Sequence, residues 1–282
     1  MLCLDFDPNL LKALESMRGF LNSAFISAFL SALAGAGLGV WGAQRLAERA
    51  ARRRELLDAL RQANALIVLA ATISNQALSI KSQHIAPLST TYFEERKDAE
   101  VTNDILLRGG IPERKVHFKA EMVHITPLTV PIEALKSLTY SVQLMPGRAL
   151  ALVAMVEQSL TELSHAIGVR SEQIELFNNK EMPMELFVQK YFGLKRRDGN
   201  TDSIYHDSMV AVTQHTDDVA FFAAELADEL QTHAGRVCKK LLRLTKDVNK
   251  ANTVDFSGSR QSGLMPPREN YESWLSGFNS QD

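Results

Sequence analysis

The chain has 282 residues, of which 45% are hydrophobic and 23% charged, and this composition excludes an intrinsically disordered protein. Its 31 Lys and Arg residues nearly balance 33 Asp and Glu residues, so no overall positive charge favours nucleic acid as a partner. The two cysteines, Cys3 and Cys238, have no metal-ligand spacing and form no disulfide framework. Few aromatic residues and many Ala, Leu, Glu, Gln and Arg predict an all-α protein.

The first predicted element is a transmembrane helix over residues 19–43, preceded by a short extracytoplasmic N-terminus, residues 1–18. These residues carry no charge, and as a helix they measure about 37 Å, more than the hydrocarbon core of a bilayer. A buried core helix and a cleaved signal peptide are the alternatives. The acidic residues Asp5, Asp7 and Glu15 before the segment disfavour the signal peptide, which needs a positively charged start.

Arginines follow the apolar segment closely and predict its orientation. Because positive residues stay in the cytoplasm, we expect a single-pass inner-membrane protein with its N-terminus outside. The same arginines are predicted to lie at the anionic leaflet, and an ordinary stop-transfer flank is favoured over specific lipid binding as their explanation. This basic set is Arg45, Arg49, Arg52, Arg53 and Arg54.

One face of the apolar segment is made of small residues, which let helix backbones approach closely in lipid. It predicts a homo-oligomer in which Ser27, Ser31, Gly35 and Gly39 form the contact. Because Ser23, Ser27 and Ser31 share this line, an oligomeric channel-forming effector is a further alternative.

Residues 44–86 contain no Pro and no Gly, and they predict a juxtamembrane basic helix or stalk that continues the transmembrane helix and carries a coiled-coil-like seam. Pro87 is expected to end it. Residues 87–250 are expected to form a cytoplasmic antiparallel helical bundle. Its predicted pieces are a helix over 93–107, an irregular or helical connector over 111–130, a helix opened by Pro131, helices over 146–168 and 171–178 separated by Gly168, a short helix over 183–192 and a long one over 202–250.

Residues 251–282 are rich in Gly, Ser and Pro and predict a flexible C-terminal tail. Within it, Tyr271, Trp274, Leu275 and Phe278 have the spacing of a short docking helix. We leave open whether this helix folds back on its own chain or binds a protein partner.

The common catalytic motifs are absent, including the Gly-rich phosphate loop and HExxH. The His206-Asp207 pair resembles the signature of the HD metal-dependent phosphohydrolases, and the resemblance implies an all-helical metal site that would also use His165. The alternative is that these are polar surface residues.

The sequence therefore predicts a membrane-anchored, self-associating helical scaffold, accessory subunit or sensor-effector, with no catalytic residues and no cofactor. Its expected partners are the lipid bilayer, further copies of itself and a protein bound by the tail, and no nucleic acid. A membrane-tethered metal phosphohydrolase is the alternative enzyme.

Overall fold

The computed structural model describes residues 8–21, 24–111, 118–142, 145–245 and 248–277. Over these residues the chain is all-helical, as predicted, and its β structure is one isolated bridge between Lys195 and Thr201. The elements are α1 (Pro8–Leu21), α2 (Ala24–Ile80), the π-helical turn η1 (Lys81–Ile85), α3 (Ala86–Leu107), α4 (Ile132–Ser141), α5 (Gly147–Asn179), α6 (Met184–Phe192), α7 (Ile204–Leu242), α8 (Ser257–Gln261), η2 (Arg268–Tyr271) and α9 (Glu272–Ser276).

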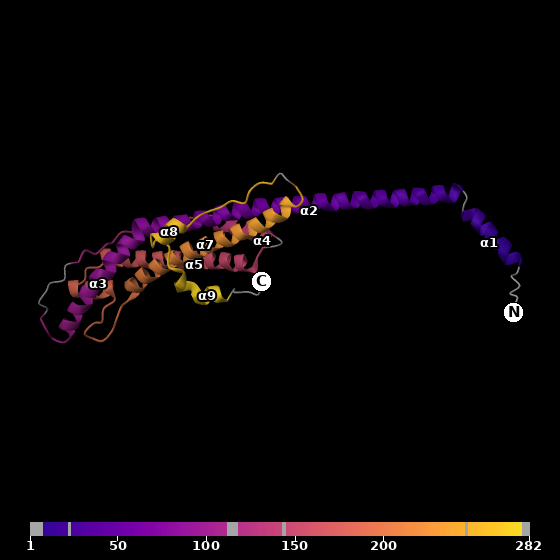
Figure 1. Ribbon diagram of the computed structural model, residues 1–282. Coiled ribbons are helices and arrows are strands. Elements are labelled where there is room, and N and C mark those ends of the chain that lie inside the picture. The colour runs from indigo at the N-terminus through magenta and orange to yellow at the C-terminus, as the bar shows by residue number, and fades with distance from the viewer. Residues whose placement is uncertain (1–7, 22–23, 112–117, 143–144, 246–247, 278–282) are drawn as a thin grey trace.

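Helix α2 is a single 57-residue helix with two different environments (Figure 1). Its N-terminal half stands away from the other long helices as an isolated rod, and there Leu46 is 67% exposed. Farther along the same helix Leu60 is 2% exposed, because α2 now packs against α7. We call the packed part of the chain, residues 57–277, the helical body.

Helix α7 lies between α2 and α5 and runs antiparallel to both (Figure 1). On the α2 side, the Ser74 hydroxyl donates to the carbonyl of Ala220, and Lys81 pairs with Asp217. On the α5 side, Arg148 reaches Glu225 and Arg170 reaches Met209. Its apolar residues, such as Val219, Leu226 and Leu230, are fully buried because neighbours cover it on both sides.

The helix does not end at Pro87, contrary to our expectation. The chain passes through the π turn η1, where the N–H of Ala86 donates to the carbonyl of Lys81, five residues back, and α3 begins at once. Pro87 then lies in the first turn of α3, where a helix tolerates a residue without an N–H donor. The predicted end of α3 before Gly109 is confirmed, since Gly109 has φ +75°.

The expected break at Gly168 is also wrong. Helix α5 continues from Gly147 to Asn179, and both Arg170 and Ile174, which follow the glycine, are fully buried. Packing against α7 and the aromatic residues beyond it stabilises this helix by more than the roughly 1 kcal/mol that one internal glycine costs.

The C-terminal segment, expected to be flexible, lies along the helical body as far as it is described (yellow in Figure 1). Phe256, Met265 and Leu275 are buried there. The ring of Tyr271 stacks on Phe221 at a centroid distance of 3.8 Å. Composition alone suggested mobility, but these few apolar residues are buried in the main hydrophobic core.

Candidate functional site

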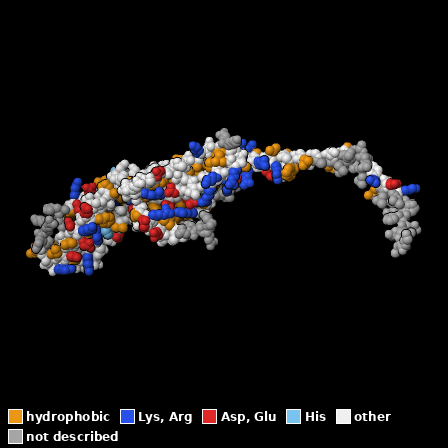
Figure 2. Space-filling view, in the orientation of Figure 1, with side chains coloured by type: hydrophobic (Ala, Val, Ile, Leu, Met, Phe, Trp, Pro, Cys, Tyr) orange, Lys and Arg blue, Asp and Glu red, His pale blue; other side chains and the backbone are white. Residues whose placement is uncertain are grey.

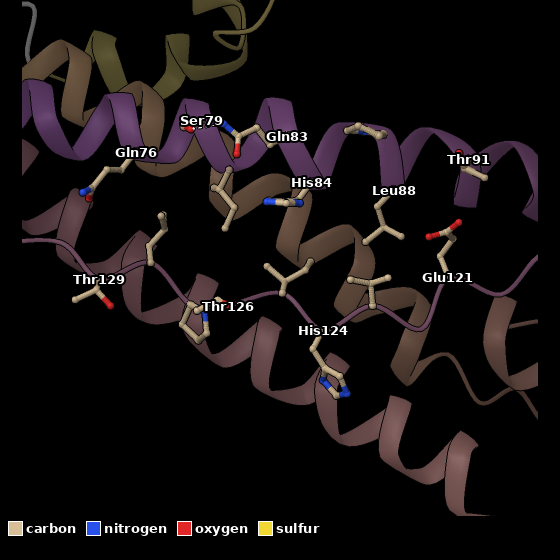
Figure 3. Close-up of a pocket in the computed structure, with 16 residues that line it drawn as sticks. Gln76, Ser79, Gln83, His84, Leu88, Thr91, Glu121, His124, Thr126 and Thr129 are labelled. Carbon is tan, nitrogen blue, oxygen red and sulfur yellow. Dashed lines mark hydrogen bonds between the residues drawn. The ribbon is translucent and has the colours of Figure 1, made fainter.

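The main groove of the helical body, with a volume of about 640 Å³, lies between the α2–η1–α3 helix and an extended segment, residues 119–131 (Figure 3). This size is in the range of small-ligand and peptide sites. The lining residues come from two stretches of chain: Gln76, Ser79, Ile80, Gln83, His84, Pro87, Leu88 and Thr91 from the helix, and Glu121, Val123, His124, Ile125, Thr126, Pro127, Leu128 and Thr129 from the extended segment.

The helical wall is built around the π turn. Such turns are single-turn interruptions of α-helices that occur frequently at functional sites, because they widen the helix and change the direction of its side chains. Here the turn contributes Gln83 and His84, and the Gln83 amide donates to the hydroxyl of Ser79 at 3.1 Å. The widened turn therefore offers amide, hydroxyl and imidazole groups on one wall.

The opposite wall is an extended backbone held in place by one buried arginine. The Arg170 guanidinium on α5 is fully buried and donates to the carbonyls of Val123, at 2.7 Å, and Glu121, at 3.1 Å. Its Nε atom also lies 3.1 Å from the sulfur of Met209. Among the residues described, no carboxylate lies within ion-pair distance of Arg170, so the two carbonyls, the Met209 sulfur and the Tyr205 ring, 5.5 Å from the guanidinium, compensate the desolvated charge.

Two further contacts fix the start of the extended segment. The N–H of Glu121 donates to the Tyr191 hydroxyl at 3.2 Å, and the N–H of Lys119 donates to the Glu95 carboxylate at 3.1 Å. Because successive residues of an extended chain point to opposite edges, the backbone groups of Met122 and His124 face away from the Arg170 edge. In the described part of the protein, no hydrogen bond reaches these groups.

The groove carries little charge. Glu121 is its one carboxylate, and neither Lys nor Arg lines it. In Figure 3 the side chains of Leu88 and Glu121 point into the gap between the two walls, whereas His124 points away from it. His124 instead lies 3.4 Å from Glu175 on α5. With unpaired backbone groups, amides and apolar side chains, the groove suits an elongated, uncharged or cationic ligand such as a peptide in extended form.

Behind the extended segment, aromatic side chains from α3, α5, α6 and the start of α7 form a second core. The Tyr92 hydroxyl donates to the Tyr191 carbonyl at 2.9 Å and lies 3.2 Å from His206 Nδ1. Burial raises the pKa of Tyr92, Tyr191 and Tyr205, so all three stay neutral. Burial, aided by the nearby Arg96, lowers the pKa of His206. This core supports the groove wall structurally.

The proposed HD metal ligands do not converge. His206 lies half-buried in the aromatic core, Asp207 accepts a hydrogen bond from the Ser203 hydroxyl at 2.7 Å, and His165 is exposed on α5. Within the described residues, no three His, Cys, Asp or Glu side chains are grouped to hold a metal ion.

The predicted oligomerisation residues lie on the isolated rod. Ser27 is in α2, but its side chain is outside the described part of the structure, and Ser31 is exposed. Gly35 and Gly39 are exposed with open space where a Cβ would project. The five arginines that follow are all exposed, and the Arg45 guanidinium lies 4.2 Å from the Trp41 ring centroid.

The predicted tail residues contact the protein's own α7. Tyr271 donates to Asp218 at 2.9 Å, Trp274 packs edge-on against Phe222, and Leu275 is buried. Phe278 lies outside the described residues. Docking of a protein partner by this segment stays a prediction, and it would require these contacts to open.

Sequence reasoning missed the groove and its central residue, Arg170. A signal was present, because Arg170 occupies the apolar stripe of α5 between Ile167 and Ile174, which are both buried. An arginine in such a stripe indicates a buried acceptor on another segment. Comparisons of the chain with protein-family models, curated proteins and solved structures find no match.

Proposed function

We propose that this protein is a membrane-anchored helical adaptor, with no catalytic role, that holds its helical body and groove at the inner face of the membrane. The observation that carries the proposal is the environment of the rod. Its described residues between 28 and 43 are uncharged, and Phe29, Leu33, Leu38, Val40 and Trp41 are each more than half exposed. A contiguous apolar surface of this kind normally marks a membrane or protein contact.

Length favours the membrane. The uncharged part of α2, residues 24–43, measures about 30 Å at 1.5 Å per residue, which matches the hydrocarbon thickness of a bilayer. Among the described residues, one helix, Ser31–Leu107, is long and apolar enough to cross a membrane. The uninterrupted helix α2 joins the anchor directly to the core.

The orientation test uses single cysteines. Cys238→Ser leaves Cys3, before the rod, as the single cysteine, and Leu242→Cys in a Cys3→Ser/Cys238→Ser background places the single thiol at the 54% exposed end of α7. In intact spheroplasts, a membrane-impermeant maleimide is expected to label Cys3 and to label position 242 only after lysis. Release of the protein by alkaline carbonate, or the reverse labelling, would overturn the anchored topology.

We also propose that adaptors associate through the small-residue face of the rod. A side chain added at Gly35 or Gly39 meets no atom of its own chain within 4 Å. Any loss of crosslinked oligomer in Gly35→Leu/Gly39→Leu therefore reports a contact with another copy. Gly37 is equally open and lies on the other side of the helix, so Gly37→Leu is the matched control. Equal crosslinking in the unmodified protein, the Gly35→Leu/Gly39→Leu variant and the Gly37→Leu control would rule this interface out.

A further inference from the structure

A basic surface that no single stretch of sequence forms lies where the rod meets the helical body. Figure 2 shows blue side chains gathered at this junction. The C-terminal end of α7 brings exposed cations to the level of the α2 arginines. The basic junction consists of Arg45, Arg49, Arg52, Arg53 and Arg54 from α2, and Arg236, Lys239, Lys240 and Arg243 from the C-terminal end of α7.

The antiparallel packing of α2 and α7 fixes this arrangement. Ser74 of α2 lies opposite Ala220 of α7. Arg243 lies 23 residues after Ala220. Because the helices are antiparallel, the residue of α2 opposite Arg243 lies 23 residues before Ser74, at Ala51, between Arg49 and Arg52. After α7 the chain turns back, and the carbonyl of Lys250 accepts a hydrogen bond from the Asn64 amide at 3.2 Å. Lys239, Lys240 and Arg243 therefore lie at the level of the α2 arginines, whereas Lys250, beside Asn64, lies about ten residues farther along α2 and outside this surface.

All the α2 arginines except Arg54, which points about 120° away from Leu60, also lie on the side of the rod that faces the body. Arg45, Arg49 and Arg52 follow spacings of four and three, and the same stripe continues through the buried residues Leu60 and Ala63 that face the body. Beyond the end of α7, this stripe carries arginine instead of apolar residues. Its guanidinium groups thus point to the side on which Lys239, Lys240 and Arg243 lie.

The charges of the basic junction are uncompensated within the chain. Among the described residues, none of the nine side chains takes part in an ion pair, although Arg45 lies over the Trp41 ring, whereas cations elsewhere do form ion pairs, including Lys81, Arg148 and Arg260. Clustered cations without a carboxylate partner create a positive potential that attracts anions from outside the chain.

We infer that the basic junction binds the headgroups of anionic phospholipids, and that α7 contributes to this contact as much as the α2 arginines do. The inference rests on the proposed function, because the apolar rod places the junction against the bilayer. Arg45 and Arg54 lie about 3 and 16 Å beyond residue 43 along the helix, a range that covers the headgroup layer and one Debye length. Each cation there adds attraction to an anionic leaflet. The contact holds the body on one side of the anchor, with the end of α7 facing the membrane.

The test measures how close the end of α7 lies to lipid. The full chain with a fluorophore on Leu242→Cys, in a Cys3→Ser/Cys238→Ser background, is reconstituted in vesicles containing lipid with a nitroxide on its headgroup. Quenching is compared between phosphatidylcholine alone and a mixture in which about a third is phosphatidylglycerol. We expect quenching to rise about twofold in the mixture and to lose this rise in high salt.

The decisive variant is Lys239→Glu/Lys240→Glu/Arg243→Glu, which leaves the α2 arginines and hence insertion untouched. It is expected to abolish the rise. The matched control, Lys97→Glu/Arg108→Glu/Lys180→Glu, makes the same change in charge with exposed cations on α3 and just after α3 and α5, and should keep the rise.

Carbonate-resistant insertion with equal quenching in both vesicle types would overturn the lipid contact alone. Absence of insertion would overturn the proposed function as well. Loss of the extra quenching in the mixed vesicles on addition of RNA at equal phosphate concentration would assign the surface to nucleic acid instead.

Discussion

An Nη1 atom of Arg268 lies 2.6 Å from an Oε1 atom of Glu225, and the Glu225 side chain is only 5% exposed. Arg268 belongs to the C-terminal segment and Glu225 to the middle of α7, so this pair fastens the end of the chain to the core. The other carboxylate oxygen of Glu225 accepts from Arg148 of α5 at 2.9 Å. One buried carboxylate thus joins three parts of the fold.

Removing the carboxylate should cost more than removing either arginine. Glu225→Ala leaves two guanidinium groups without their acceptor and is expected to lower the free energy of unfolding by about 3 kcal/mol. Arg268→Ala leaves Glu225 paired with Arg148 and should cost about 1 kcal/mol. Urea unfolding of the full chain in detergent measures both. Equal losses would show that Arg148 does not compensate the buried charge.

The C-terminal segment should open when its aromatic contact is lost. Tyr271→Ala removes the stacking on Phe221, exposes Phe222 and should make the segment after residue 250 sensitive to limited proteolysis. Tyr271→Phe keeps the ring and loses only the hydrogen bond to Asp218. The segment should therefore be cleaved several-fold more slowly in Tyr271→Phe than in Tyr271→Ala. If both variants are cleaved alike, the hydroxyl and not the ring holds the segment.

The groove wall should depend on Arg170. Arg170→Met keeps an apolar chain of similar length but leaves the carbonyls of Glu121 and Val123 without a donor, at an expected cost of about 3 kcal/mol. Arg170→Lys retains a cation that can reach one carbonyl, so its free energy of unfolding should fall by less than that of Arg170→Met. Hydrogen exchange over residues 119–131 is the direct measurement. Unchanged protection in Arg170→Met would mean that other contacts hold the segment.

Stability should fall in mild acid because of two half-buried histidines. Burial holds the pKa of His206 and of His233 below the ordinary value of 6.5, so the unfolded chain takes up protons more readily than the folded protein. Their contribution is constant above pH 6.5 and is lost as the pH falls from 6.5 toward the folded-state pKa. His206→Gln should flatten this part of the stability curve, measured as denaturant midpoints at several pH values. An unaltered curve would assign the effect to His233 alone.

Local sequence was sufficient for most helices, because their signals are local. Periodicity located α7, Gly109 ended α3 and Pro131 preceded α4, as the structure has them. The errors at Pro87 and Gly168 share a cause. A residue that breaks an isolated helix is tolerated where a π turn or burial against α7 stabilises the helix by more than the break costs.

By itself the sequence determined the helical character of the chain, the long uncharged segment and the arginines that follow it, since composition and 3.6-residue periodicity act on neighbouring residues. Only the tertiary structure decided that the C-terminal segment docks on α7, that Arg170 pins residues 121–123 and that the end of α7 joins the α2 arginines. These contacts unite residues tens to hundreds of positions apart. No local pattern encodes them, because they depend on which helices lie antiparallel and on where each one ends.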